Sequence, residues 1–231
     1  MEKPADQKRP ERIIPVYFFF ICDSSDLMKI PRGNSTIRPI DILNYAVPDI
    51  IGKTGKLLNG HLKFKGFIRV LTYSEKAEWQ NLDNIRPASY VWKELQAQGK
   101  SNLGAAFIRL AKALRLREHR GLMRTDGPIP IIILVVGTVP HDDWKNGLGQ
   151  LNAQFWGEHA IRFAVSFDSC DHEVLIRFLD MNNNQLHSLS IDHIDELPSR
   201  ILAVLKERYV RLGNTCEESS GISRNLEDEK N

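Results

Sequence analysis

Residues 16–28 have the sequence VYFFFICDSSDLM, in which a continuous apolar run ends abruptly in small polar residues. The apolar residues of this run do not alternate with polar ones, so both faces of the segment are predicted to be buried, which is typical of a strand inside a parallel sheet. Open α/β sheets bind their ligands at the carboxyl edge. We therefore expect Asp23, Ser24, Ser25 and Asp26 to lie where a binding site would form.

Length, charge and cysteine content narrow the class of protein. The 231 residues are enough for one α/β domain with a full core, and the net charge of +2 is too balanced for a dedicated nucleic-acid surface. No apolar run reaches the roughly 18 residues of a membrane span. The three cysteines, Cys22, Cys170 and Cys216, lack the spacing of a metal site. These features predict a cytoplasmic protein that contacts neither a membrane nor, directly, nucleic acid.

Apolar periodicity alternates between strand and helix along the chain. Strands are predicted at 13–21, 64–73, 129–136 and 160–167, and helices at 39–58, after a cap at Ser101 or Asn102, at 142–155, 171–179 and 197–212. Strands that are separated by helices require crossover connections. The predicted fold is a single α/β domain at 13–212, with three layers and a doubly wound, mostly parallel sheet of the Rossmann-like kind. Its central strands should be 13–21 and 129–136, between a disordered lead (1–12) and a flexible acidic tail (213–231).

Motifs for common enzyme classes are missing. The sequence has no G-x-S-x-G elbow, no H-E-x-x-H helix and no glycine-rich dinucleotide fingerprint. Asp23 follows a buried strand, as does the nucleophile of haloacid-dehalogenase-type phosphatases, but Ser25 stands where those enzymes need a second aspartate. An Asp23-based phosphoryl-transfer or hydrolytic enzyme is therefore the alternative reading. Asp168, Asp171 and His172 follow another strand, and a loop with a helix cap is the simpler explanation for them.

The polar cluster after the first strand has two interpretations. Carboxylate and hydroxyl oxygens are ligands for a hard cation such as Mg²⁺, so Asp23 and Ser25 are candidates for a cation site completed by neighbouring loops. The competing interpretation is that Asp23 and Ser25 tie down their own turn through side-chain hydrogen bonds to the backbone.

Three blocks of this sequence resemble the von Willebrand factor A (VWA) domains, and within them the bacterial TerY-like group of tellurite-resistance proteins. Residues 14–28 are similar to the opening strand and its D-x-S-x-S motif, and residues 99–104, GKSNLG, are similar to G-G-T-x-L-G. Residues 131–144 resemble an apolar strand followed by T-D-G-x-P-x-D-D-W. The blocks occur in the expected order, so the resemblance covers roughly residues 13 to 210.

The resemblance implies a metal-ion-dependent adhesion site that is incomplete here. Asp23, Ser25 and Ser101 match three of its five ligand positions, whereas Leu27 and Gly137 stand at the other two and supply no ligand. The triplet at 125–127, T-D-G, precedes its strand and should form a turn at the opposite edge of the sheet. The expected site is degenerate, with weak Mg²⁺ binding or none.

The resemblance also implies a role. We expect a non-catalytic protein-interaction module of a bacterial stress-response or phage-defence assembly, with a Ser/Thr kinase and a protein phosphatase as partners. A further alternative is a regulatory subunit that scaffolds a nucleic-acid-handling assembly without touching nucleic acid itself.

The expected contact surface is the set of polar and aromatic residues on the loops of that edge. They are Ser24, Asp26, Lys29, Lys100, Asn102, His141, Asp142 and Trp144. Trp144 either anchors a partner, because tryptophan is enriched in binding hot spots, or packs back on its own domain as the first turn of a helix. Cys22 is expected to be a buried structural residue with an unreactive thiol.

Overall fold

A computed structural model describes residues 13–33, 35–61, 63–119, 129–168, 170–179 and 187–208. The predicted lead (1–12), the predicted tail (213–231), the turn at 125–127 and Cys216 lie outside these residues. None of the described helices is both long and apolar enough to cross a bilayer.

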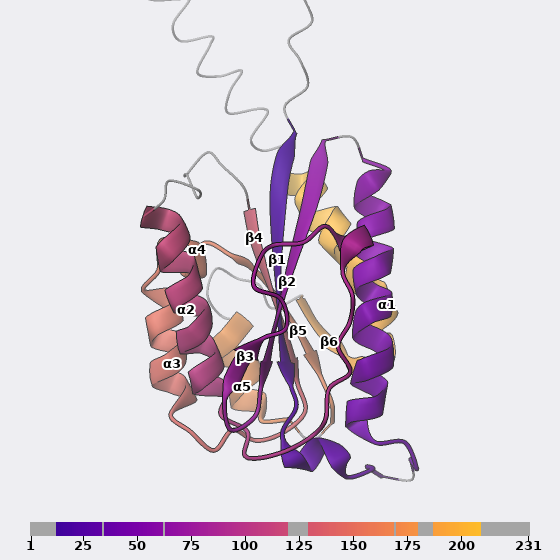
Figure 1. The fold of residues 1–231 in the computed structure, drawn as a ribbon, viewed down its shortest axis with the longest axis vertical. Helices are drawn as coiled ribbons and strands as arrows, with labels where there is room; N and C mark the ends of the chain where they lie inside the picture. Colours follow the sequence, from indigo (N-terminus) through magenta and orange to yellow (C-terminus); the bar gives the residue numbers. More distant parts are fainter. Residues whose placement is uncertain are drawn as a thin grey trace, which may run out of the picture.

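The described strands form one six-stranded sheet in the order β3-β2-β1-β4-β5-β6 (Figure 1). Their bounds are β1 Ile14–Asp23, β2 Phe64–Tyr73, β3 Ala77–Trp79, β4 Ile129–Val136, β5 Ile161–Ser166 and β6 Ser188–Ser190. All neighbours pair in parallel except β2 and β3. The prediction that β1 and β4 are central is confirmed. The short edge strands β3 and β6 were not predicted, since three residues carry no readable periodicity.

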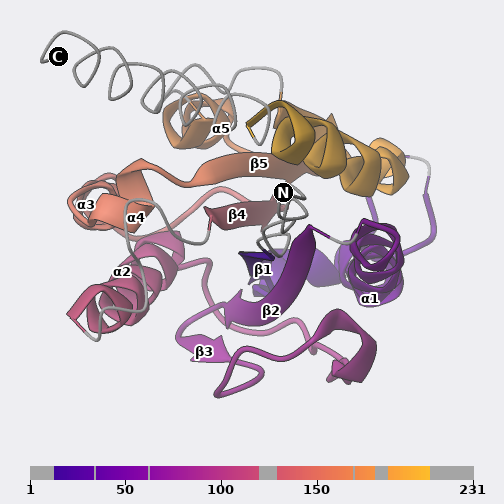
Figure 2. The ribbon, with the colours of Figure 1, turned by 90° about the horizontal axis from the view of Figure 1, so that it is seen from above.

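Helices cover both faces of the sheet. They are α1 Pro39–Asn59, α2 Leu103–His119, α3 Trp144–Asn152, α4 Phe155–Glu158, α5 His172–Leu179 and a helical stretch at 197–208. Figure 2 shows α1 and the 197–208 helix on one side of the sheet, and α2, α3 and α5 on the other. The predicted three-layer α/β domain is therefore confirmed, although the helix predicted at 142–155 is divided into α3 and α4.

The central strand separates two hydrophobic clusters. Phe18 and Phe20 of β1 pack towards α1, whereas Phe19 and Ile21 pack towards α2, and all four are buried. Successive side chains of a strand point to opposite faces, so an uninterrupted apolar run supplies both clusters at once. This double burial is what the apolar run in the sequence predicted.

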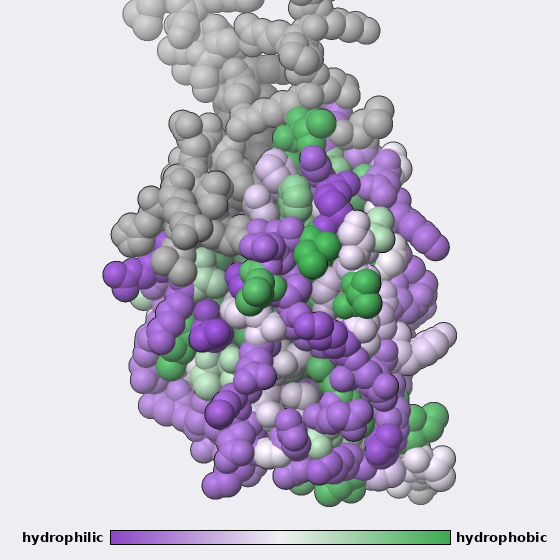
Figure 3. Space-filling view, in the orientation of Figure 1, coloured by the Kyte–Doolittle hydropathy of each residue, from purple (hydrophilic) through white to green (hydrophobic). Residues whose placement is uncertain are grey.

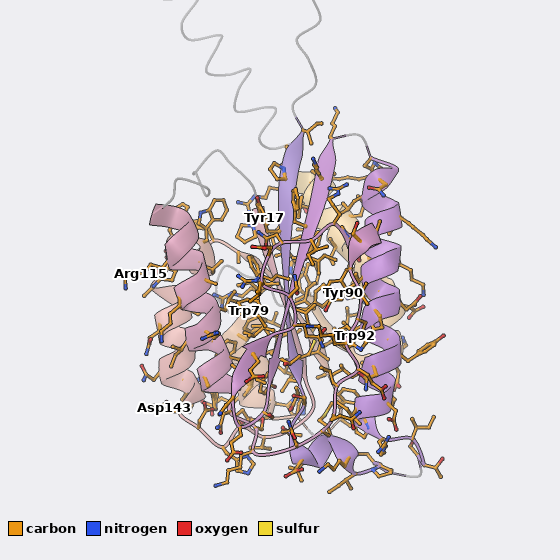
Figure 4. The ribbon with its side chains drawn as sticks, viewed as in Figure 1. Tyr17, Trp79, Tyr90, Trp92, Arg115 and Asp143 are labelled. Carbon is orange, nitrogen blue, oxygen red and sulfur yellow. The ribbon has the colours of Figure 1, made fainter. Side chains whose placement is uncertain are left out.

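The parallel strands β1, β2, β4 and β5 all end at the same edge, which is the lower edge in Figure 1. The 3₁₀ helix η1, Asp26–Lys29, follows β1 there, and α2 and α3 both begin there. In Figure 4, Asp143 marks this end of α3, while Tyr17 lies nearer the opposite edge of the sheet.

Candidate site at the carboxyl edge of the sheet

Three loops meet at this edge and are joined through their backbones. The loop after β1 is tied to the segment before α2, because Asp26 N donates to the carbonyl of Gly99 at 2.8 Å and Gln98 N donates to that of Ser24 at 2.9 Å. The loop after β4 joins them, because His141 N donates to the carbonyl of Ser101 at 2.7 Å. These bonds fix the relative positions of all three loops.

Asp23 lies at the centre of this junction with no exposed surface. Its Oδ1 accepts a hydrogen bond from Ser25 N at 2.9 Å, as the turn-tying interpretation predicted. Its Oδ2 accepts from the Thr138 hydroxyl at 2.7 Å and from Gly137 N at 3.3 Å. The carboxylate therefore joins the end of β1 to the loop after β4, using both of its oxygens.

Thr138 is the residue of this junction that sequence reasoning missed. Besides its bond to Asp23, its hydroxyl is 3.1 Å from the Ser25 hydroxyl, and both residues are buried. Thr138 comes two residues after β4 ends, just as Ser25 comes two residues after β1 ends. A hydroxyl residue at the end of the second central strand was the signal that could have found it.

Two further hydroxyls, those of Ser101 and Tyr73, face the same junction. Both are fully buried and neither has a well-aligned hydrogen-bond partner among the described residues. Burial is the main cause that raises the pKa of Tyr73, and Asp23 and Ser101 are close enough to influence that pKa as well. The structure therefore places Asp23, Ser25 and Ser101, the three predicted metal ligands, around one buried spot.

The residues at that spot fit a divalent cation poorly. Mg²⁺ demands near-octahedral oxygen ligands, keeps several waters and is held by protein carboxylates that have oxygens available to it. Here hydrogen bonds from the protein already occupy both oxygens of the Asp23 carboxylate. Within the residues that the structure describes, no group of three or more His, Cys, Asp or Glu side chains could hold a metal ion. Leu27, at a missing ligand position, is 42 % exposed and offers no oxygen.

Gly137, at the other missing ligand position, has no room for a side chain. A Cβ atom there would collide with the sulfur of Met28 and would come within 3.2 Å of the Phe167 ring. Met28 itself is fully buried. Restoring an aspartate at position 137 would therefore require Met28 to move, which the sequence did not indicate.

Part of the predicted contact surface is confirmed as exposed. Asp26, Lys29, Lys100 and His141 are exposed on the three loops. Lys29 Nζ lies 2.6 Å from Asp26 Oδ1, and this contact lowers the pKa of Asp26. Asn102 is half-buried and its side-chain amide donates to the Glu75 carbonyl at 3.1 Å.

Two residues of the predicted surface, Ser24 and Asp142, form hydrogen bonds within the domain instead. Ser24 is only 7 % exposed, and its hydroxyl donates to the Tyr73 carbonyl at 3.0 Å. Asp142 is half-buried and accepts from Gly104 N at 3.0 Å and from Ala105 N at 2.9 Å. Asp142 thus accepts hydrogen bonds from free backbone amides at the amino end of α2. Ser101 or Asn102 had been expected to cap this end of the helix.

Trp144 packs against its own domain, which is the second of the two alternatives considered for it. It is 7 % exposed and belongs to the cluster beneath α2. As the first residue of α3, it is directed inward with Leu148 and Leu151. The idea that Trp144 is an exposed anchor is therefore wrong.

A hollow of about 660 Å³ opens beside the junction. It lies between the ends of β2 and β3 and the segment at 94–99, with a mainly polar lining that includes Ser24, Thr72, Glu75, Glu78, Glu94 and Gln98. Figure 3 shows the same end of the molecule as mostly hydrophilic, with a few separate hydrophobic residues.

Comparisons with known proteins identify the fold. No protein-family model matches the sequence, and no curated protein matches it either. Among solved structures, a VWA protein from Catenulispora acidiphila matches 81 % of this chain with a TM-score of 0.52 and 11 % identity. The pilus adhesin SpaC from Lactobacillus rhamnosus GG matches 84 % with a TM-score of 0.58 and 11 % identity.

A third similar structure, proximal thread matrix protein 1 from the mussel byssus, has a zinc-occupied metal-ion-dependent adhesion site. It matches 84 % of this chain with a TM-score of 0.52 and 11 % identity. The chain spans 42 %, 30 % and 46 % of the lengths of these three structures, respectively. At such identities the likeness concerns the fold alone, and that fold is the VWA fold.

Proposed function

We propose that this chain is a non-catalytic protein-interaction module that contacts its partner through the carboxyl edge of the sheet. The observation that carries the proposal is the arrangement of Asp26, Lys29, Lys100 and His141, which are exposed on three loops fixed by backbone hydrogen bonds. A rigid rim with charges of both signs favours partner choice and association rate. The polar hollow beside it extends the same surface.

The position of Asp23 supports an interaction role over an enzymatic one. A nucleophile or general base must reach its substrate, and Asp23 has no exposed surface. Both of its oxygens accept hydrogen bonds from the protein. Hydrolysis by an Asp23 nucleophile would require these bonds to break and the three loops to separate.

For the partner, we propose a Ser/Thr kinase and protein phosphatase assembly in the bacterial cytoplasm, serving stress response or phage defence. The support is the resemblance of three sequence blocks to the TerY-like group. Nucleic acid is not proposed as a direct ligand, since the net charge is only +2.

The test is a binding titration against the products of neighbouring genes, with charge reversals on the rim. Asp26→Lys and Lys100→Glu should each weaken binding about tenfold or more, mainly through a slower association rate. Lys112→Glu is the matched control, because Lys112 is exposed on α2, outside the three loops. If both rim variants bind every partner as the wild type does, the contact surface lies elsewhere.

A further inference from the structure

The amino-terminal half of β2 presents two cations and an aromatic ring on one face of the sheet. Lys65, Phe67 and Arg69 are two residues apart, so their side chains point to the same side. Further along this side, Leu71 and Tyr73 are completely buried in the cluster beneath α2. Lys65, in contrast, is exposed, and Phe67 and Arg69 are half-buried. This half of the face is therefore open to a partner.

An aromatic ring holds two cations of this face in place. Phe67 stacks on Tyr17 of β1, with the ring centres 5.2 Å apart. The Lys65 ammonium lies 5.8 Å from the centre of the Phe67 ring, and the Arg86 guanidinium lies 5.5 Å from it. The negative face of an aromatic ring attracts a cation, so Phe67 draws both positive charges to one place.

The third cation, Arg69, is held in the same manner. Its guanidinium lies 3.9 Å from the centre of the Trp79 ring, and its Nε donates to the Asn81 carbonyl at 3.3 Å. Figure 4 shows Trp79 on the α2 side of the strands. Arg86 is fixed further by its Nη1, which donates to the Gly66 carbonyl at 2.9 Å. The three cations are thus positioned before any partner arrives, which lowers the entropy cost of binding.

The charge of this face favours an anionic partner. In the part of the chain that the structure describes, neither Lys65 nor Arg86 pairs with a carboxylate, and their contacts are with an aromatic ring and neutral acceptors. Carboxylates form strong hydrogen bonds with guanidinium and ammonium groups. An extended peptide places alternate side chains on one side every 6.6 Å or so, which is also the period of β2. Acidic residues on one side of such a peptide therefore match the cations on β2.

The rings are less suited to nucleic acid. Single-stranded nucleic acid binds when its bases stack on aromatic side chains. Phe67 already stacks on Tyr17 and carries two cations, so its own chain occupies the ring. What the face offers to a partner is positive charge at fixed positions, which suits carboxylates.

We propose that Lys65, Phe67, Arg69, Trp79 and Arg86 form a second contact surface, which binds an extended acidic peptide segment of a partner protein. This surface lies towards the amino end of β2, whereas the rim of the three loops lies at the carboxyl edge. It therefore does not depend on the function proposed for the rim.

The experiment is a fluorescence anisotropy titration of the full chain with a labelled peptide in which glutamate alternates with serine. The wild type should bind it saturably at low salt. Lys65→Glu and Arg86→Glu should each weaken binding about tenfold, because they reverse a charge on the surface. Lys65 is exposed and its described contact is with a ring, so Lys65→Glu keeps the test valid even if Arg86→Glu does not fold.

Two control variants carry charge reversals elsewhere. Lys206→Glu alters an exposed residue of the 197–208 helix, on the other side of the sheet (Figure 2). Asp26→Lys alters the rim. Both should bind the peptide as the wild type does. A loss in Lys206→Glu equal to that in Lys65→Glu would show attraction to overall charge alone, and a loss in Asp26→Lys would place the peptide on the rim. Either result would overturn the proposal.

Phe67→Leu tests the rings without changing any charge. It should weaken peptide binding about two- to fivefold, because Lys65 and Arg86 lose the ring that positions them. Unchanged affinity in this variant, or no saturable binding to the wild type, would overturn the proposal. Tighter binding of an oligothymidine, weakened by Lys65→Glu, would assign the surface to nucleic acid and overturn it as well.

Discussion

Among the residues that the structure describes, the charged side chains of Asp23 and Arg162 have no exposed surface, and their hydrogen-bond partners differ in kind. Asp23 sits at the end of a central strand, where two backbone amides and the Thr138 hydroxyl donate hydrogen bonds to its carboxylate. Arg162 lies near the start of β5, among neutral acceptors: the carbonyls of Phe178 at 2.9 Å and Gly157 at 2.7 Å, and the Asn152 side chain.

The comparison separates a position typical of a ligand site from a purely structural one. Burial lowers the pKa of Arg162 to about 10. Its guanidinium lies 5.2 Å from the centre of the Phe178 ring and joins α4, α5 and β5. Arg162 is held by carbonyls deep in the domain, so its role is structural. Asp23 also stabilises the fold, but it does so at the carboxyl edge of the sheet, where this kind of fold binds ligands.

Arg162→Met should have the largest effect. It removes three hydrogen bonds and leaves two buried carbonyls without donors, so we expect a loss of about 3–5 kcal/mol in the free energy of unfolding. Chemical denaturation measures the loss. Arg162→Lys should keep part of the stability, and a loss below that of Asp23→Ala would reverse the order of the two buried charges.

Asp23→Ala should cost somewhat less, about 2–3 kcal/mol, because it leaves smaller donors unsatisfied and creates a smaller space. Denaturation in chelator and in Mg²⁺ provides the measurement. Ser25→Ala is the milder companion, since it removes a single hydroxyl contact with Thr138. An Asp23→Ala protein as stable as the wild type would mean that the junction does not depend on the carboxylate.

Gly137→Ala tests how tightly the junction is packed. The new methyl group must displace the sulfur of Met28, so we expect a loss of about 1–3 kcal/mol. Met28→Ala should make room and recover part of that loss, which a double-mutant cycle detects as favourable coupling. Strictly additive effects would contradict the contact between these two residues.

The smallest expected effect concerns His187, whose ring Nδ1 lies 2.9 Å from the Arg162 carbonyl. Burial is the main cause that lowers the pKa of His187, and Arg200 contributes. Because the unfolded chain then binds the proton more readily, stability should fall as the pH drops through about 6.5, the usual histidine pKa.

Unfolding measured from pH 5 to pH 8 in the wild type and in His187→Phe tests this expectation. The ring of His187 stacks on Phe163 at 4.4 Å, so phenylalanine is the conservative replacement. The variant should be less sensitive to pH in the acidic part of this range. If the dependence of stability on pH is the same in His187→Phe as in the wild type, His187 does not cause the loss of stability at acidic pH.

Prediction from sequence succeeded where the residue pattern of a single segment determines its burial. The apolar run of β1 predicted burial on both faces and a polar cluster at its end, and both are confirmed. The same run predicted that Cys22 is buried, and burial followed by the charge of Asp23 raises the pKa of its thiol. Its lack of reactivity towards thiol reagents remains a prediction.

Prediction was undecided or wrong where the outcome depends on partners distant in sequence. The sequence left two alternatives open for Trp144, and packing against α2 decides between them. Asp142 was expected on the contact surface, yet it accepts hydrogen bonds from the amino-terminal amides of α2. No local pattern reports such contacts, because hydrogen bonds and packing across 37 or 38 residues depend on how the chain returns to itself.

The sequence by itself determined the α/β class, the central position of β1 and β4 and the place of Asp23 at their shared edge, because hydrophobic periodicity and strand ends are local properties. Only the tertiary structure decided that Thr138 completes the hydrogen bonds of Asp23 and that Met28 fills the space beside Gly137. Those outcomes depend on three loops meeting at one edge, and their mutual fit exists only once the sheet has formed.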